Sequence, residues 1–105
     1  MKADLDQLKA SAAEASRFLR ALANEKRLLT LCQLVGTEQS VGALAEAVGL
    51  SQSALSQHLT KLREDGLVAT RRDSQTIYYR LADPRIETMI GLLYDQFCNP
   101  SPVRR

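Results

Sequence analysis

Apolar residues recur along the chain at helical spacing, interrupted by short polar segments and one β-rich stretch. The first apolar stripe advances in steps of three and four residues and comprises Leu5, Leu8, Ala12, Ala15, Leu19 and Leu22. This spacing predicts a helix within residues 1–23 that has one narrow apolar face. The face either packs on the core of its own domain or contacts a second copy of the chain. We favour the dimer contact, because so regular an N-terminal helix has little monomer core to cover.

Three further helices are predicted from their capping residues and apolar stripes. The predicted N-caps are Asn24, Ser40 and Ser51, and the helices end near Val35, at Gly49 and near Glu64. Gly49 suits a helix end because glycine adopts the left-handed conformation without strain. The inward-facing residues are expected to be Leu28, Leu31, Cys32 and Val35 in the first of these helices, Leu44, Ala45 and Val48 in the second, and Leu55, Leu59 and Leu62 in the third.

The last third of the chain changes from the helical pattern to a β pattern and back. Residues 68–72 and 76–81 are β-rich and are joined by Asp-Ser-Gln at 73–75, which predicts a hairpin. Asp83 and Pro84 then suit the N-cap and first position of a final helix that reaches Cys98. Asn99 and Pro100 break this helix, and we expect residues 99–105 to form a flexible tail.

The predicted order is α-α-α-α-β-β-α in a single domain, 1–105, that is mainly α with a small β-hairpin. A short helix that ends at Gly49, a new helix capped by Ser51 and a basic hairpin are together typical of a winged helix-turn-helix. The second helix of that motif lies in the DNA major groove. We therefore expect a homodimer that binds double-stranded operator DNA, with dimerisation helices at 1–23 and 83–98.

Composition adds little to this fold prediction but locates the surplus charge. Fourteen basic and twelve acidic residues give a net charge of +2 over 105 residues. Residues 51–80 alone carry five basic and three acidic residues, so the surplus lies in the predicted DNA-binding segment. The N-terminus has no apolar signal core and no run is long enough to span a membrane, so we expect a cytoplasmic protein with reduced thiols and no membrane partner.

The candidate DNA contacts fall into three groups. Small polar residues opposite the apolar stripe of the third capped helix are candidate base readers: Ser53, Ser56, Gln57 and Thr60. Lys61 and Arg63 are candidate phosphate contacts on the same helix. Arg71 and Arg72 beside the wing loop, with Gln75, are expected to reach phosphate or the minor groove. The alternatives are an ordinary solvated helix face and a solubilising hairpin.

Three segments carry a resemblance to a known family. SQSALSQHLTKLREDGLV and RRDSQTIYYRL are similar to the recognition helix and wing of the ArsR/SmtB family of bacterial repressors, and NEKRLLTLC to the helix that follows its N-terminal arm. The resemblance covers nearly the whole chain and implies a transcriptional regulator that is not an enzyme. The third-helix segment SVGALAEAV has no Cys or His and the last helix has no His, so the family's two metal sites lack ligands. We expect no metal and no other cofactor.

Two cysteines remain to be explained. Without the resemblance, a redox pair and two inert thiols are equally plausible interpretations of Cys32 and Cys98. Both cysteines and the tail LLYDQFC resemble the dithiol branch of the family, which implies that reactive sulfur species or oxidants link Cys32 to Cys98 within one chain. Lys26 and Arg27 favour Cys32 as the nucleophile, since the negative end of a helix dipole disfavours a thiolate at Cys98.

Three alternative functions follow from the same residues. The two thiols could hold arsenite or another thiophilic metal as inducer, with the DNA-binding function unchanged. The winged helix could instead be an interaction module that binds protein and no DNA, although the polar helix face and the paired wing arginines argue against this. A thiol oxidoreductase is disfavoured, because the chain has no C-x-x-C motif.

Overall fold

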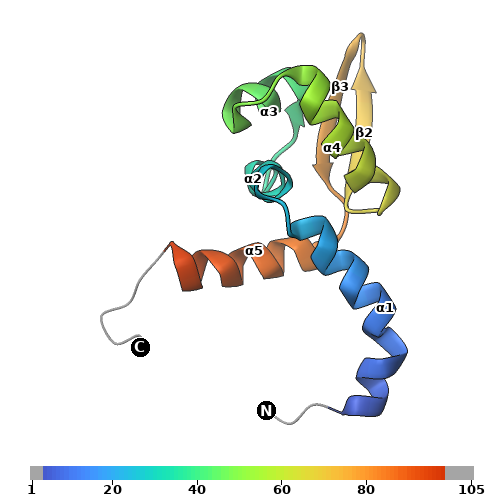
Figure 1. The fold of residues 1–105 in the computed structure, drawn as a ribbon. Coiled ribbons are helices and arrows are strands. Elements are labelled where there is room, and N and C mark those ends of the chain that lie inside the picture. Colours follow the sequence, from blue (N-terminus) through green and yellow to red (C-terminus); the bar gives the residue numbers. More distant parts are fainter. Residues whose placement is uncertain (1–3, 99–105) are drawn as a thin grey trace.

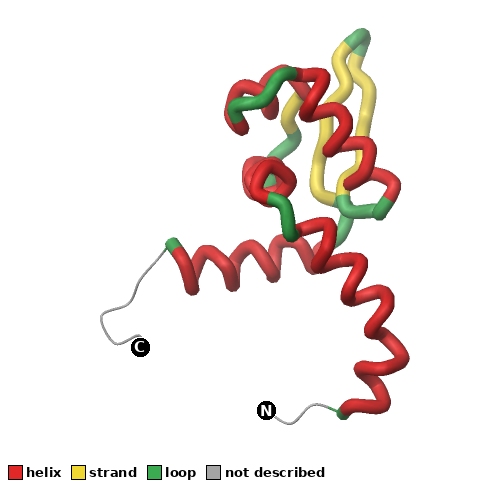
Figure 2. Tube along the Cα trace, in the orientation of Figure 1, coloured by secondary structure: helices red, strands yellow, loops and turns green. Residues whose placement is uncertain are grey.

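The fold, taken from a computed structural model, is described for residues 4–98 and is a winged helix-turn-helix, as predicted (Figure 1). The expected flexible tail at 99–105 lies outside the described residues. Helices and a small antiparallel sheet alternate along the chain (Figure 2). The elements are α1 (Leu5–Leu22), α2 (Glu25–Gln33), β1 (Gln39–Ser40), α3 (Val41–Val48), α4 (Gln52–Glu64), β2 (Val68–Asp73), β3 (Thr76–Leu81) and α5 (Pro84–Phe97).

The predicted capping residues begin four of the helices. The side chains of Asn24, Ser40 and Ser51 accept hydrogen bonds from backbone N–H groups three residues later, at 3.0, 3.2 and 3.1 Å. Asp83 accepts a bond of 2.9 Å from the backbone of Arg85, with Pro84 at the first helical position. Gly49 ends α3 in the left-handed conformation, with φ at 81°. The starts of the two helices of the helix-turn-helix, and the end of the first, were therefore correctly predicted from their capping residues.

The sheet contains one strand that the sequence analysis missed. β2 and β3 form the predicted hairpin, with Arg71 opposite Tyr78, and only Ser74 and Gln75 make its turn. β1 pairs antiparallel with the other edge of β3 and places Gln39 opposite Tyr79. Because β1 runs directly into α3, the wing and the helix-turn-helix are joined through backbone pairing.

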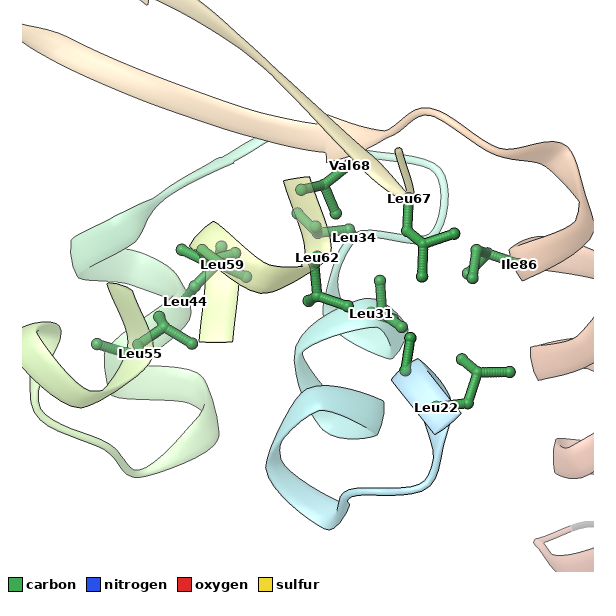
Figure 3. Packing of buried hydrophobic residues seen from close by; sticks show 12 residues of the cluster. Leu22, Leu31, Leu34, Leu44, Leu55, Leu59, Leu62, Leu67, Val68 and Ile86 are labelled. Carbon is green, nitrogen blue, oxygen red and sulfur yellow. The ribbon is translucent and has the colours of Figure 1, made fainter. Parts of the chain in front are cut away.

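The core lies between α2, α3, α4 and the base of the wing (Figure 3). Its fully buried apolar side chains are Leu31, Leu34, Leu44, Leu55, Leu59, Leu62 and Ile86. The predicted inner stripe of α2 was partly wrong, since Cys32 and Val35 are exposed and Leu34 is buried. For Leu34 and Val35 the reason is that α2 ends at Gln33, and the Leu34 N–H bonds to Leu31 O at 3.1 Å in a tighter turn that redirects these two residues. Cys32 lies within α2, on the side that faces the depression beside α5.

α1 and α5 project from this body in different directions, as Figure 1 shows. In α1 only Ala21 and Leu22 are buried, and in α5 only Ile86 is. The Cα radius of gyration is 15.6 Å, against about 13 Å for a compact chain of this length. No helix among residues 4–98 is both long and apolar enough to cross a membrane.

Candidate nucleic-acid interface and thiol pair

α4 presents a polar face whose direction is set by its buried side. Leu55, Leu59 and Leu62 are 0 % exposed and fix the rotation of the helix against the core. The four predicted base readers, Ser53, Ser56, Gln57 and Thr60, are all exposed on the helix. The structure thus gathers these four on an exposed helical surface of the kind that enters a major groove.

The four candidate readers differ in their free hydrogen-bonding capacity. The Thr60 hydroxyl donates to the backbone carbonyl of Ser56 at 2.9 Å, so its proton is already used. The Gln57 amide makes no hydrogen bond to any other part of residues 4–98. Both its oxygen and its nitrogen are therefore available, which is what bidentate bonding to an adenine edge needs.

The two wing arginines have different surroundings. Arg71 Nε lies 2.7 Å from Glu38 Oε1, and its guanidinium carbon lies 4.7 Å from the ring centroid of Tyr78. The hydrogen bond to Glu38 is the main reason why the pKa of Arg71 is raised. Arg72 is exposed opposite Ile77 and forms no ion pair within the described part of the chain. Of these two arginines, Arg72 is therefore the one without an ion pair, and Gln75 is exposed in the turn between the strands.

Sequence reasoning missed Glu38, which precedes β1 and contacts Arg71 across 33 positions of sequence. Its side chain is 32 % exposed, and Asp73 lies at 3.9 Å from the same arginine. A single Glu in a polar segment carries no signal of such a contact. Only the position of β1 beside β3 brings the carboxylate to the wing.

Cys32 lies on α2, and Cys98 lies immediately after the C-terminal end of α5. Cys32 of α2 lines an open, mainly apolar depression of about 510 Å³ together with Ile90, Gly91 and Tyr94 of α5. Cys98 directly follows α5, and its N–H donates to Tyr94 O at 2.8 Å. Both thiols are free and exposed. The fold thus brings α2 and α5 together beside Cys32. Cys98 lies one helical turn beyond Tyr94, one of the α5 residues that line the depression.

The electrostatics around Cys32 do not favour a thiolate there, and its role as the nucleophile stays a prediction. Although Cys32 is exposed to solvent, the protein atoms packed around its thiol partly desolvate it, and this desolvation raises its pKa. The nearby Cys98 raises the pKa of Cys32 further. Lys26 Nζ lies 3.4 Å from the carbonyl of Val48, and the Arg27 guanidinium donates to the carbonyls of Ala21 and Arg20. Both cations are therefore directed to helix ends, and neither lowers the pKa of Cys32.

The structure offers no alternative metal centre in its described part. Within residues 4–98 no three His, Cys, Asp or Glu side chains are grouped so that they could hold a metal ion. The only histidine of the sequence, His58, is half-buried on α4. The absence of a metal cofactor stays a prediction.

Comparisons with known proteins agree with this geometry. Residues 24–70 match the family described as "Bacterial regulatory protein, arsR family". The chain is 47 % identical over 95 residues to the transcriptional activator HlyU of Vibrio cholerae, covering 90 % of this chain and 88 % of that protein. The structure of reduced HlyU from V. cholerae superposes with a TM-score of 0.83 at 48 % identity, covering 88 % of this chain and 97 % of that one. The transcriptional repressor BigR of Xylella fastidiosa gives a TM-score of 0.86 at 38 % identity, over 91 % and 98 % of the two chains.

Proposed function

The chain belongs to the ArsR family of bacterial transcriptional regulators, and from this premise we propose that it is a homodimeric repressor that releases its operator when Cys32 and Cys98 become linked. One observation carries the proposal. The two cysteines lie on α2 and after α5, and α2 packs on the DNA-binding body while α5 projects from it. A covalent link between them joins the body to the projecting helix.

The inducer we propose is a reactive sulfur species or an oxidant. With peroxide, the two thiols lose two protons and two electrons, the S–S bond forms and the peroxide is reduced to water. With a polysulfide, thiol–disulfide exchange transfers two sulfur atoms to one thiol, giving Cys–S–S–SH and a shorter polysulfide as the leaving group. The second thiol then attacks the middle sulfur, hydrosulfide leaves, and the resulting Cys–S–S–S–Cys link keeps one added sulfur atom. An added sulfur atom also widens the reach of the link, since a plain disulfide requires Cα atoms within about 7 Å.

The dimer is supported by unpartnered apolar side chains on α1 and α5. Leu5, Leu8 and Leu19 of α1 are 52–64 % exposed, and Phe97 of α5 is 78 % exposed. Apolar surface of this extent on projecting helices marks an interface. The core of the monomer buries only the C-terminal end of the α1 stripe. The rest of the stripe is therefore left for contact with a partner subunit, which is the interpretation that we favour.

Release follows from dimer geometry. The two α4 helices must be about 34–36 Å apart to enter successive major grooves. Because α5 is both a dimer helix and the attachment point of Cys98, a link to α2 changes the angle between each body and the dimer contact. A coupling of about 1–3 kcal/mol lowers operator affinity by about 5- to 150-fold.

Selection of binding sites from random duplex DNA by the reduced protein tests the DNA-binding part of the proposal. We expect an inverted repeat to be enriched, and to bind at least ~10³-fold more tightly than random duplex at physiological salt. Equal affinity for both DNAs would support the protein-binding winged helix instead. Arsenite added to the selected complex distinguishes the alternative inducer, because release with arsenic mass on both thiols would replace the sulfur chemistry.

A further inference from the structure

A depression at the corner where α1 ends, α2 begins and α4 ends is lined mainly by cations. Its volume is about 470 Å³, and its charged walls are Arg17, Arg20, Arg27, Lys61 and Asp65. Four cations and one carboxylate give this corner a charge of +3, whereas the whole sequence carries +2. We call these five residues the basic corner.

The basic corner is only partly neutralised, because Asp65 is its single carboxylate against four cations. Every ion pair found in residues 4–98 involves Arg71 or Arg85, so none of the four cations is paired. The nearby Glu14 is already bound to Arg85 at 3.4 Å. Four cations held near one carboxylate still repel one another, and an anion that enters the depression reduces that repulsion.

One of the four cations is fixed by the end of α1. Arg27 Nε donates to Ala21 O at 2.9 Å and its Nη2 donates to Arg20 O at 3.0 Å. These carbonyls form the negative end of the α1 dipole and stabilise the guanidinium. The side chains of Arg17, Arg20 and Lys61 have no such support and are exposed, so they are free to bind a ligand.

The position of Lys61 identifies the anion. Lys61 directly follows Thr60 on α4 and lies one turn beyond Gln57, so the basic corner continues the exposed face of that helix. A duplex that lies along α4 therefore passes beside the corner. We propose that the basic corner binds backbone phosphates of the operator, which adds Arg17 and Arg20 of α1 to the DNA interface. The inference rests on the proposed DNA-binding function.

The test compares charge removal inside and outside the corner on the same helix. Arg20→Gln and the double variant Arg17→Gln/Arg20→Gln remove one and two cations of the corner, and Lys9→Gln removes an exposed cation of α1 away from it. The slope of log affinity against log salt falls by about 0.9 for each phosphate of duplex DNA that the protein no longer neutralises. We expect a slope lower by about one unit for the single variant and about two for the double variant, on operator and random DNA alike.

The controls separate this inference from the proposed function. Lys9→Gln is expected to keep the wild-type slope, and circular dichroism is expected to show unchanged helix content in all variants, because the substituted side chains are exposed. If the wild type binds the operator selectively and the double variant has the slope of Lys9→Gln, the basic corner is wrong and the proposed function stands. If the wild type itself does not prefer operator DNA, the proposed function fails first.

A free oxyanion is the other possible source of the same chemistry. Inorganic phosphate is therefore titrated at constant ionic strength into the wild type and the double variant, and heat of binding is recorded. If phosphate shows no saturable binding and the double variant has a lower salt slope on DNA, the result supports operator phosphates as the ligand of the basic corner. Saturable phosphate binding that requires Arg17 and Arg20, with an unchanged DNA slope, would overturn the assignment to DNA.

Discussion

At the scale of single residues, the two thiols have unequal environments. Desolvation of the Cys32 thiol raises its pKa, and a negative charge at Cys98 raises it further by repulsion. Cys98→Ser removes the repulsion and leaves the desolvation. We therefore expect the pKa of Cys32 to fall in this variant, while it stays above the ordinary thiol value.

Alkylation by iodoacetamide from pH 7 to pH 11, followed by mass analysis of the peptide that contains Cys32, measures this shift, because only the thiolate reacts. The midpoint of the rate profile for Cys32 should move to lower pH in Cys98→Ser than in the wild type. A midpoint that stays in place or moves upward would show that the two thiols do not sense each other.

We expect base reading to depend on Gln57 more than on the other candidate readers. Gln57 is the candidate reader with both amide groups free, so Gln57→Ala should weaken operator binding by about 1–3 kcal/mol. Binding to random duplex should hardly change, because base contacts add little to non-specific affinity. Fluorescence anisotropy on both DNAs measures the difference. An equal reduction on both would remove Gln57 from the reading role.

At the scale of elements, the wing is expected to act through its arginines. Removing Arg71 and Arg72 together should lower affinity on all sequences and reduce the salt slope by about one unit for each phosphate that the wing no longer binds. Of the single variants, Arg72→Ala should account for more of the slope, since Arg71 is bound to Glu38 at 2.7 Å. Salt titrations from about 50 to 200 mM provide the measurement. An unchanged slope in the double variant would exclude the wing from the interface.

The elements also show what a sequence can predict. The helix starts at Asn24, Ser40, Ser51 and Asp83 were predictable because an N-cap bonds to backbone only two or three residues away. β1 could not be predicted, because its two residues form a strand only by pairing with Tyr78 and Tyr79, which are distant in sequence.

The candidate site also has features that depend on local sequence and features that depend on distant segments. The exposed face of α4 follows from helical periodicity, so the four candidate readers were correctly predicted to be exposed, and their base-reading role stays a prediction. The contact between Glu38 and Arg71, the basic corner and the raised pKa of Cys32 all depend on segments distant in sequence. Neither spacing nor composition records which of these segments will touch.

At the scale of the whole molecule, the two projecting helices carry exposed apolar residues, and we propose that a second copy of the chain covers them. Light scattering of the wild type should give twice the chain mass of 11.6 kDa. Leu8→Glu places a charge in the α1 stripe and should shift the protein to monomer, while the neighbouring Gln7→Glu keeps the dimer, because Gln7 lies off the stripe. A dimer that persists unchanged in Leu8→Glu would exclude the α1 stripe from the interface.

The link between thiol chemistry and DNA release is tested most directly by one paired measurement. Wild type, Cys32→Ser and Cys98→Ser are treated with polysulfide, and intact mass and operator affinity are recorded on the same samples. We expect the wild type to gain sulfur with an intrachain link and to bind the operator about 5- to 150-fold more weakly. Both single variants should bind the operator when reduced and keep that affinity after treatment. Normal release by either single variant would contradict the two-cysteine switch.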